Sequence, residues 1–464
     1  MDARLYQKWC YLDFIKLKDN EVDYFSKDMN PEKRVIIPKM MSNNVVYAPQ
    51  VIILIDDKDV FLTMLRVDGK VFYRNIKGEI IQIRNEHRLE QGEQKSASLL
   101  VVNEPAPEIN EDWFKIIFSD VEKKVKGAIK ITTNQNITLL NINSKVLQAG
   151  EFVLESYDSL QKGIENKGEQ NLRFKIIPDS VTDLIWKDTE KSVFQAASQF
   201  NCLEMAHPSA TPENGITNYY TDKTQGPKCA IMCGAGTYYR NYLYNGGQTR
   251  IKQINTIEES LKSIGFLTKG NVISDGTNEF RYSNGYLLGD IKSHEAVGNI
   301  LKNQQLLSQF RSNFNIGIHY DTQVWNTERT VHQVYASALP LSYSNIGKND
   351  VIKGSGIEKF VQELNLVYET TILAAEKCRI RDKTDRKKVY LTLVGGGVFE
   401  NPIANIVLAI RSVLEKYKHL PLDIILVDFN NDNKLTNNDF SFDKKIKYLK
   451  YKSKYLELKN LTNI

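Results

Sequence analysis

A triple glycine stands between an apolar strand pattern and a helical pattern in "LTLVGGGVFENPIANIVLAI", residues 391–410. Glycine turns of this kind let backbone N–H groups approach an anion, and the free N–H groups at a helix N-terminus suit a phosphate. Gly395, Gly396 and Gly397 form neither the Gly-Lys-Ser/Thr ending of a Walker loop nor the G-x-G-x-x-G fingerprint of dinucleotide-binding folds. The turn therefore predicts an anion site of another kind. The alternative is a tight turn that binds no ligand.

Hydrogen-bonding and small residues are concentrated in a second segment, between residues 199 and 243. The group consists of Asn201, Glu204, Glu213, Asn214, Gly215, Asp222, Thr224, Gln225, Gly226 and Arg240. Within it, "TQGPKCAIMCGAGTYY" is typical of a loop that enters a helix of small residues, where backbone and ligand can approach closely. We interpret the segment as a candidate binding region. The alternative is a polar loop whose side chains only cap helices.

The cysteine and histidine patterns give no support for a metal site. Cys229 and Cys233 have no second pair at zinc spacing, so we expect packed thiols there. His319 and His332 flank strand patterns and are more typical of structural imidazoles than of site residues.

The stretch "DFNNDNKLTNNDF" (428–440) imitates a calcium-binding loop. Loop positions 1, 3, 5, 7 and 12 are occupied by Asp428, Asn430, Asp432, Lys434 and Asp439. The sixth position is Asn433 rather than glycine, and the twelfth is aspartate rather than glutamate. We therefore favour a polar linker, with Ca²⁺ binding at 428–439 as the alternative, and we predict that no metal is required.

The elements that must position these residues divide the chain into three parts. Residues 1–165 hold short Val, Ile and Tyr runs broken by turn residues, which predicts a β-rich N-terminal domain. A polar linker at 160–171 precedes residues 172–436, where strand and helix patterns alternate. That alternation predicts a parallel α/β sheet with right-handed crossovers, and ligands bind such sheets at the carboxyl ends of the strands. The glycine turn and Phe429 both lie at such ends.

Charge is concentrated at the C-terminal end. The 464 residues carry a net charge of +5, and residues 441–464 alone hold seven lysines and two acids. A basic amphipathic tail is expected at 440–464, as a solvated capping helix or a frayed end, and contact with nucleic acid, a membrane surface or an acidic partner is the alternative. No apolar run is long enough to span a membrane, and no secretion signal is visible at the N-terminus. Five scattered cysteines fit a reducing compartment, so we expect a cytoplasmic protein.

Several ordered motifs resemble those of macrodomains, the α/β fold that binds ADP-ribose. The motifs are "FNCLEM", "PENGITNYYTDKTQGP", "AGTYYRNY", "HYDTQV", "VHQVYASALPLSY" and "LVGGGVF", and together they span roughly residues 190–430. They look like a divergent branch found in eukaryotes, in large DNA viruses and in a bacterial effector that removes ADP-ribose from ubiquitin. "PENG" stands where macrodomains usually have an early glycine run. The lysine- and tyrosine-rich tail is also similar to chain ends in large DNA virus proteins, which suggests host cytoplasm or a virion as the location.

The resemblance implies that the ligand is ADP-ribose. The N–H groups of Gly395, Gly396, Gly397, Val398 and Phe399 would then wrap the diphosphate, and no metal is required for its charge. The remaining contacts to the ligand are expected from Asn201, Glu213, Asn214, Gly215, Thr224, Gln225 and Gly226. Phe399 would cover a ribose, and Phe429 would stack on the adenine.

Cleavage of an ADP-ribosyl bond passes through an oxocarbenium-like state, so a carboxylate is expected near the anomeric carbon. Asp222 and Asp321 are the predicted catalytic residues, and capping of loops is the alternative for each. The resemblance implies a hydrolase that releases ADP-ribose from a modified protein, through an arginine or through ubiquitin. A non-catalytic ADP-ribose reader and a structural virion protein that retains the fold are the alternatives.

Overall fold

The chain divides into two compact units, residues 1–113 and 114–464. The computed structural model describes the main chain of eight strands in the first unit. In the second unit it describes residues 130–134, 136–142, 145–164, 171–325, 327–429 and 435–440. The basic tail predicted at 440–464 lies outside the described residues, apart from Phe440.

The described strands of the first unit form two antiparallel sheets, one with the order β1-β2-β3 and one with the order β4-β5-β6-β7-β8. Their bounds are β1 Asp13–Lys18, β2 Glu21–Phe25, β3 Val35–Pro38, β4 Met40–Ser42, β5 Val45–Ile55, β6 Lys58–Val67, β7 Lys70–Asn75 and β8 Ile80–Ile81.

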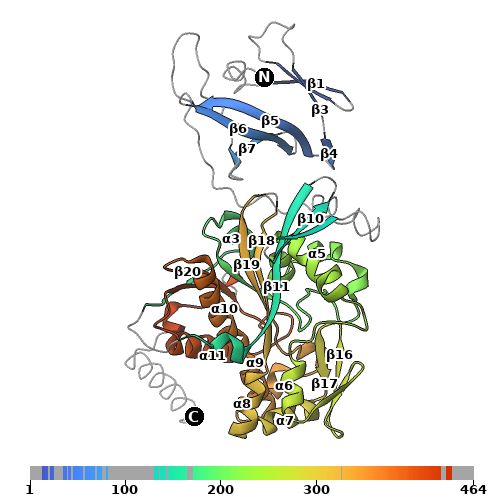
Figure 1. The fold of residues 1–464 in the computed structure, drawn as a ribbon, viewed down its shortest axis with the longest axis vertical. Helices are drawn as coiled ribbons and strands as arrows, with labels where there is room; N and C mark the ends of the chain where they lie inside the picture. Colours follow the sequence, from blue (N-terminus) through green and yellow to red (C-terminus); the bar gives the residue numbers. More distant parts are fainter. Residues whose placement is uncertain are drawn as a thin grey trace, which may run out of the picture. The chain divides into compact units, whose positions relative to one another are not determined.

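The second unit is built on a nine-stranded mixed sheet with the order β12-β21-β20-β13-β19-β18-β11-β10-β9. Figure 1 labels β10, β11, β18, β19 and β20 of this sheet. Its strands are β9 Lys130–Asn134, β10 Ile137–Ile142, β11 Lys145–Ser156, β12 Arg173–Ile177, β13 Val193–Ala197, β18 Asn315–Gln323, β19 Thr330–Ala336, β20 Lys387–Thr392 and β21 Leu422–Val427. The five strands from β12 to β19 run parallel, whereas β18, β11, β10 and β9 pair antiparallel. Most residues of β13, β19, β20 and β21 are buried, as expected for parallel strands covered on both faces, whereas the edge strand β12 exposes Arg173 and Lys175.

Helices cover both faces of this sheet. The main ones are α2 Tyr157–Gln161, α3 Val181–Lys187, α4 Gln225–Met232, α5 Gly234–Tyr242, α9 Gly356–Leu364, α10 Leu366–Asp382 and α11 Ile403–Lys416. His319 of β18 lies against Gly236 of α5, and its neighbour Tyr320 lies under Arg381 of α10. Successive strand residues face opposite sides, so α5 and α10 lie on opposite faces and the unit has three layers, α/β/α.

A small lobe is inserted between α5 and β18. Its elements are α6 Glu258–Ser263, β14 Leu267–Lys269, β15 Val272–Ser274, β16 Glu279–Ser283, β17 Tyr286–Gly289, α7 Ile291–Ile300 and α8 Gln304–Ser312. The four strands form an antiparallel sheet in sequence order. The turn between β16 and β17 packs on the loop that follows β13, where the N–H of Phe200 donates to the carbonyl of Gly285 at 2.9 Å and Asn284 Nδ2 donates to the carbonyl of Pro208 at 2.7 Å.

The strands β9, β10 and β11 correct the predicted domain boundary. The sequence places residues 130–156 in an N-terminal domain that ends near 165. In the structure β11 pairs with β18 from Glu151↔Tyr320 to Ser156↔Asn315, so these strands belong to the main sheet. Alternating apolar residues reveal that a strand exists, but they do not reveal its partner. The described helices of the chain include none that is long and apolar enough to cross a membrane.

Candidate functional site

The loops that follow β13, β19 and β20 meet at one edge of the sheet, because these strands are parallel and adjacent. The first loop carries Asp222, the second carries Tyr343 and the third is the glycine turn. This is the edge at which ligands bind in sheets of this kind.

The glycine turn presents unpaired donors. Gly395 has φ +80°, a conformation that favours glycine, and its carbonyl accepts the N–H of Asn401 at 2.9 Å. None of the N–H groups of Gly397, Val398 and Phe399 donates to an acceptor among the described residues. Val398 is 53% exposed, so these donors lie at the surface. Successive unpaired N–H groups form a concavity that suits a phosphate.

The glycine turn is fixed from two sides. The Tyr368 hydroxyl accepts the N–H of Val394 at 2.8 Å and donates to the carbonyl of Thr392 at 3.1 Å. Asn401 Nδ2 donates to the carbonyl of Leu339, in the neighbouring loop, at 2.7 Å. The donors are therefore held in place before any ligand arrives, which lowers the entropic cost of binding.

Asp222 lies where a short 3-10 helix, η4 (Thr217–Thr221), gives way to α4. Its Oδ1 accepts from the N–H of Thr224 at 2.8 Å and from the Thr224 hydroxyl at 2.6 Å. Its Oδ2 has no donor within the described part of the chain, so one carboxylate oxygen stays available.

The first turn of α4 is pressed against the end of β13. A Cβ on Gly226 would lie 1.8 Å from the carbonyl oxygen of Ala197, so no side chain fits there. Gln225 Oε1 accepts from the N–H of Val181 at 2.8 Å. Among the predicted ligand contacts, Gly226 and Gln225 thus have roles in placing α4, and Thr224 has one in orienting Asp222.

Three aromatic rings connect the Asp222 loop to the glycine turn. The ring centroids of Tyr286 and Tyr343 are 5.4 Å apart, and those of Tyr286 and Phe399 are 5.7 Å apart. Burial, the neighbouring Tyr343 and the charge of Asp222 raise the pKa of Tyr286, and burial and Asp222 raise the pKa of Tyr343. Asp222 therefore lies within electrostatic range of both rings. The edge of the sheet thus combines anion donors, an aromatic surface and a carboxylate.

Two further residues that the sequence predicts to contact the ligand, Asn201 and Glu213, have hydrogen-bond partners within the protein. Asn201 is fully buried, its Nδ2 donates to Gln253 Oε1 at 2.9 Å, and its Oδ1 accepts from the N–H of Leu203 at 3.0 Å. Glu213 Oε1 accepts from the N–H of Arg250 at 2.7 Å.

Asn214 and Gly215 complete the same short turn. Asn214 Oδ1 accepts from the N–H of Thr211 at 2.7 Å, and Gly215 has φ +86°. In this structure Asn201, Glu213, Asn214 and Gly215 shape the loop through contacts within the protein.

Asp321 does not lie beside Asp222, so the two carboxylates that the sequence predicts to be catalytic do not share one site. Asp321 is near the end of β18, and β18 runs antiparallel to β19. Its N–H donates at 3.2 Å to His332 Nδ1, at the start of β19, and its carboxylate pairs with Lys191 and with Arg381, the latter at 3.2 Å. Asp321 thus lies at the amino ends of the parallel strands, the edge opposite to the glycine turn.

Asp321, His332 and Asp382 have potential metal-ligating atoms within 4.8 Å of one another. Ammonium groups already neutralise these carboxylates, because Lys191 lies 2.9 Å and Lys387 lies 2.5 Å from Asp382. Burial opposes ionisation of Asp382, yet the hydrogen bond from His332 and these lysines hold its pKa well below the usual value. A divalent ion would have to displace both lysines, so we assign these residues to an ion-pair cluster.

The candidate calcium loop is only partly described. Asn430, Asp432 and Lys434 lie outside the described residues. Asp428 is fully buried and accepts from the N–H of Leu435 at 3.3 Å. Phe429 follows it with 37% of its surface exposed, at the carboxyl end of β21.

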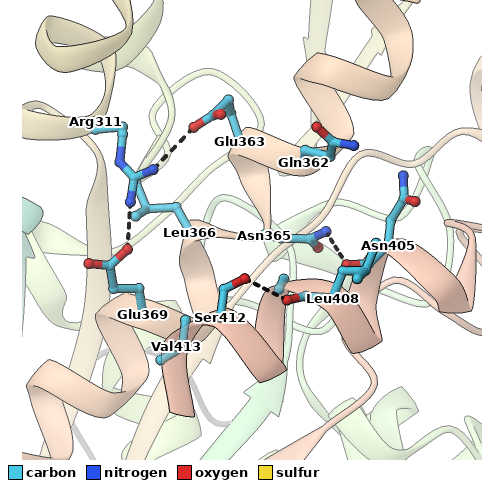
Figure 2. A pocket seen from close by; sticks show the side chains of 11 residues that line it. Arg311, Gln362, Glu363, Asn365, Leu366, Glu369, Asn405, Leu408, Ser412 and Val413 are labelled. Carbon is cyan, nitrogen blue, oxygen red and sulfur yellow. Dashed lines mark hydrogen bonds and ion pairs between the residues drawn. The ribbon is translucent and has the colours of Figure 1, made fainter. Parts of the chain in front are cut away.

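A cavity of about 260 Å³ lies between α9, α10 and α11, with Arg311 of α8 in its wall. Figure 2 shows Arg311 turned toward Glu363 and Glu369, whereas no dashed line reaches the side-chain amides of Gln362 and Asn405. Arg311 pairs with Glu363 at 3.4 Å and with Glu369 at 2.5 Å. Glu369 also accepts from the hydroxyl of Tyr417 at 2.7 Å. This cavity is walled by paired charges, unlike the glycine turn with its unpaired donors.

Sequence reasoning missed the two tyrosines of the aromatic group. Tyr343 stands in the quoted motif "VHQVYASALPLSY", but nothing in the motif singles it out. Tyr286 follows an Asn-Gly turn in the inserted lobe, and only the fold brings that turn to the Asp222 loop.

No family model matches the sequence, and no curated protein matches it. Among solved structures, the chain is similar to poly(ADP-ribose) glycohydrolase from Thermomonospora curvata bound to the inhibitor ADP-HPD. The identity is 9% and the TM-score 0.32, over 69% of this chain and 94% of that one. The enzyme of the same name from Deinococcus radiodurans, in complex with ADP-ribose, has 10% identity and a TM-score of 0.31, over 62% of this chain and 92% of that one. Similarity at this level supports no transfer of function by itself.

Proposed function

We propose that this chain binds ADP-ribose at the loops that follow β13, β19 and β20, and that it hydrolyses the bond between ADP-ribose and a modified protein. The observation that carries the proposal is the set of unpaired N–H groups at Gly397, Val398 and Phe399. They lie at the same edge of the sheet as the loop that carries Asp222. A diphosphate needs several preorganised donors, and these three suit it without a metal. The sequence resemblance to macrodomains supports the same ligand.

The chemistry would take place at the far end of the ligand. With the diphosphate on the glycine turn, the aromatic group of Tyr286, Tyr343 and Phe399 would cover a ribose. The free Oδ2 of Asp222 would stabilise the positive charge that develops at the anomeric carbon, or accept a proton from the attacking water. Thr224 holds the other oxygen and so fixes the direction of the carboxylate.

Two measurements test the proposal. Calorimetric titration with ADP-ribose should give saturable heat, and an absence of heat at millimolar ADP-ribose would reject the site. The second measurement is the release of ADP-ribose from arginine-modified protein and from ADP-ribosylated ubiquitin. Binding without release from either substrate would leave a reader of ADP-ribose rather than a hydrolase.

A further inference from the structure

The loop that carries Asp222 rests on a fully buried arginine. Arg240 of α5 has no exposed surface. Its Nε donates to the carbonyl of Cys202 at 2.9 Å, one terminal nitrogen donates to the Tyr335 hydroxyl, and the other lies 3.4 Å from Glu204 Oε2. A guanidinium removed from water is costly unless its N–H groups are satisfied. Two of these partners, Cys202 and Glu204, belong to the loop between β13 and α4.

A buried tyrosine continues this support to Asp222. The N–H of Glu204 donates to the Tyr219 hydroxyl at 3.1 Å. Tyr219 belongs to η4, and its carbonyl accepts the N–H of Asp222 at 3.2 Å. Tyr219 is 2% exposed, so water does not compete for its hydroxyl. Hydrogen bonds therefore lead from Arg240 through Glu204 and Tyr219 to Asp222 without interruption.

The hydrogen bonds between Arg240 and Asp222 differ in length and therefore in strength. Burial raises the pKa of Glu204 to about 7 although Arg240 opposes the shift, and its Oε1 has no hydrogen-bond partner in the described part of the chain. At 3.4 Å, its contact with Arg240 is a long hydrogen bond. The bonds to the Cys202 carbonyl and to the Tyr219 hydroxyl are shorter, so they contribute more to the position of the loop.

We propose that Arg240 and Tyr219 are positioning residues for Asp222. They hold the loop from beneath, so that the free carboxylate oxygen faces the anomeric carbon of a bound ADP-ribose. The inference rests on the proposed function. It adds that the rate of bond cleavage depends on two buried groups that never touch the substrate.

The test compares Tyr219→Phe with Tyr239→Phe. The first variant removes the hydroxyl that joins Glu204 to η4 and keeps the ring. The second removes a hydroxyl on α5, next to Arg240, that has no hydrogen bond within the described chain. A displacement of about 1 Å at a reacting group can cost about 100-fold in rate. We expect Tyr219→Phe to lower kcat about tenfold or more with KM within about twofold, and Tyr239→Phe to match the wild type.

Amide hydrogen exchange without ligand supplies a readout that does not depend on activity. The Asp222 and Thr224 amides should exchange about tenfold faster in Tyr219→Phe than in the wild type, and at the wild-type rate in Tyr239→Phe. Arg240→Lys keeps the charge and loses the fork of donors, so it should show the same pattern if it folds. Unchanged exchange and unchanged kcat in Tyr219→Phe would overturn the inference while leaving the proposed function intact. Faster exchange in Tyr219→Phe, together with a wild-type protein that releases no ADP-ribose, would show the coupling and reject the proposed hydrolysis.

Discussion

The two edges of the main sheet each hold an aspartate that the sequence marks as catalytic, and they differ in what surrounds it. Asp222, at the carboxyl edge, has one oxygen bound to Thr224 and one without a donor among the described residues. Asp321, at the amino edge, is paired with Lys191 and Arg381. A group that is already satisfied stabilises the fold, whereas a preorganised group with a free oxygen can act on a ligand. Under the proposed function, this difference places the chemistry at the edge with Asp222 and a stabilising role at the edge with Asp321.

Replacement of the two aspartates is the strongest test of this contrast. Asp222→Asn should lower the release of ADP-ribose about 100- to 10,000-fold, the range for loss of a general acid or base, with ADP-ribose affinity within about threefold. Asp321→Asn should leave the rate constant of release near the wild-type value, because its side chain lies at the opposite edge. Single-turnover release assays on both variants check this. Equal losses of rate in the two variants would contradict the assignment.

The glycine turn should be sensitive at its strained position. A Cβ on Gly395 would lie 2.5 Å from Ala338 Cβ, and the residue has φ +80°. Gly395→Ala should therefore distort the turn and weaken ADP-ribose binding about tenfold or more.

Gly270→Ala is the matched control for Gly395→Ala. Gly270 also has positive φ, +63°, but a Cβ there meets nothing within 4 Å, and it lies in the β14–β15 turn. The Gly270→Ala variant should lose stability through backbone strain, as Gly395→Ala does, but should keep the full affinity for ADP-ribose in calorimetric titration. Full affinity in Gly395→Ala would exclude this turn as the diphosphate site.

The ion-pair cluster should appear in the pH dependence of stability. The folded pKa of Asp382 is held well below 3.8, its ordinary value. A depressed carboxyl pKa contributes stability that is fully present above the unfolded pKa and is lost as pH falls through the folded one. Wild-type unfolding free energy should therefore fall more steeply below about pH 4 than that of Asp382→Asn. Denaturant titrations between about pH 6 and pH 2 measure this, and parallel curves would contradict the pairing.

Divalent metals should have the smallest effect. The lysines beside Asp382 occupy the positions that a cation would take in the cluster of Asp321, His332 and Asp382. We expect a chelator, or added Zn²⁺ or Ca²⁺, to shift Tm by less than about 1 °C. A rise of several degrees with one metal would show that the ion displaces the lysines, since a ligand that binds only the folded state raises stability.

The sequence predicts the part of the site that local pattern determines. The strand at Lys387–Thr392, the helix at Ile403–Lys416 and the strand at Leu422–Val427 follow from continuous apolar runs, from the glycines and from a proline at the helix start. The same pattern correctly places Gly395 and Phe429 at the carboxyl ends of parallel strands.

Strand direction is what local pattern cannot supply. Asp222 and Asp321 both stand in polar, motif-like stretches of the sequence, but β18 is antiparallel to β19, and this places Asp321 at the other edge of the sheet. Local pattern also does not give a strand's partner, so the sequence predicts β9, β10 and β11 to lie in an N-terminal domain, although they pair within the main sheet. Tyr286 reaches the site only through packing of the inserted lobe, a contact between distant segments with no local sequence signal.

The most direct test of the central claim is amide hydrogen exchange of the full chain with and without saturating ADP-ribose. The proposed site predicts slower exchange at the amides of Gly397, Val398 and Phe399, because their N–H groups would bind the diphosphate. The amides around Asp321 should be unchanged. Protection confined to the ion-pair cluster or to the cavity between α9, α10 and α11, or no protection at all, would contradict the claim.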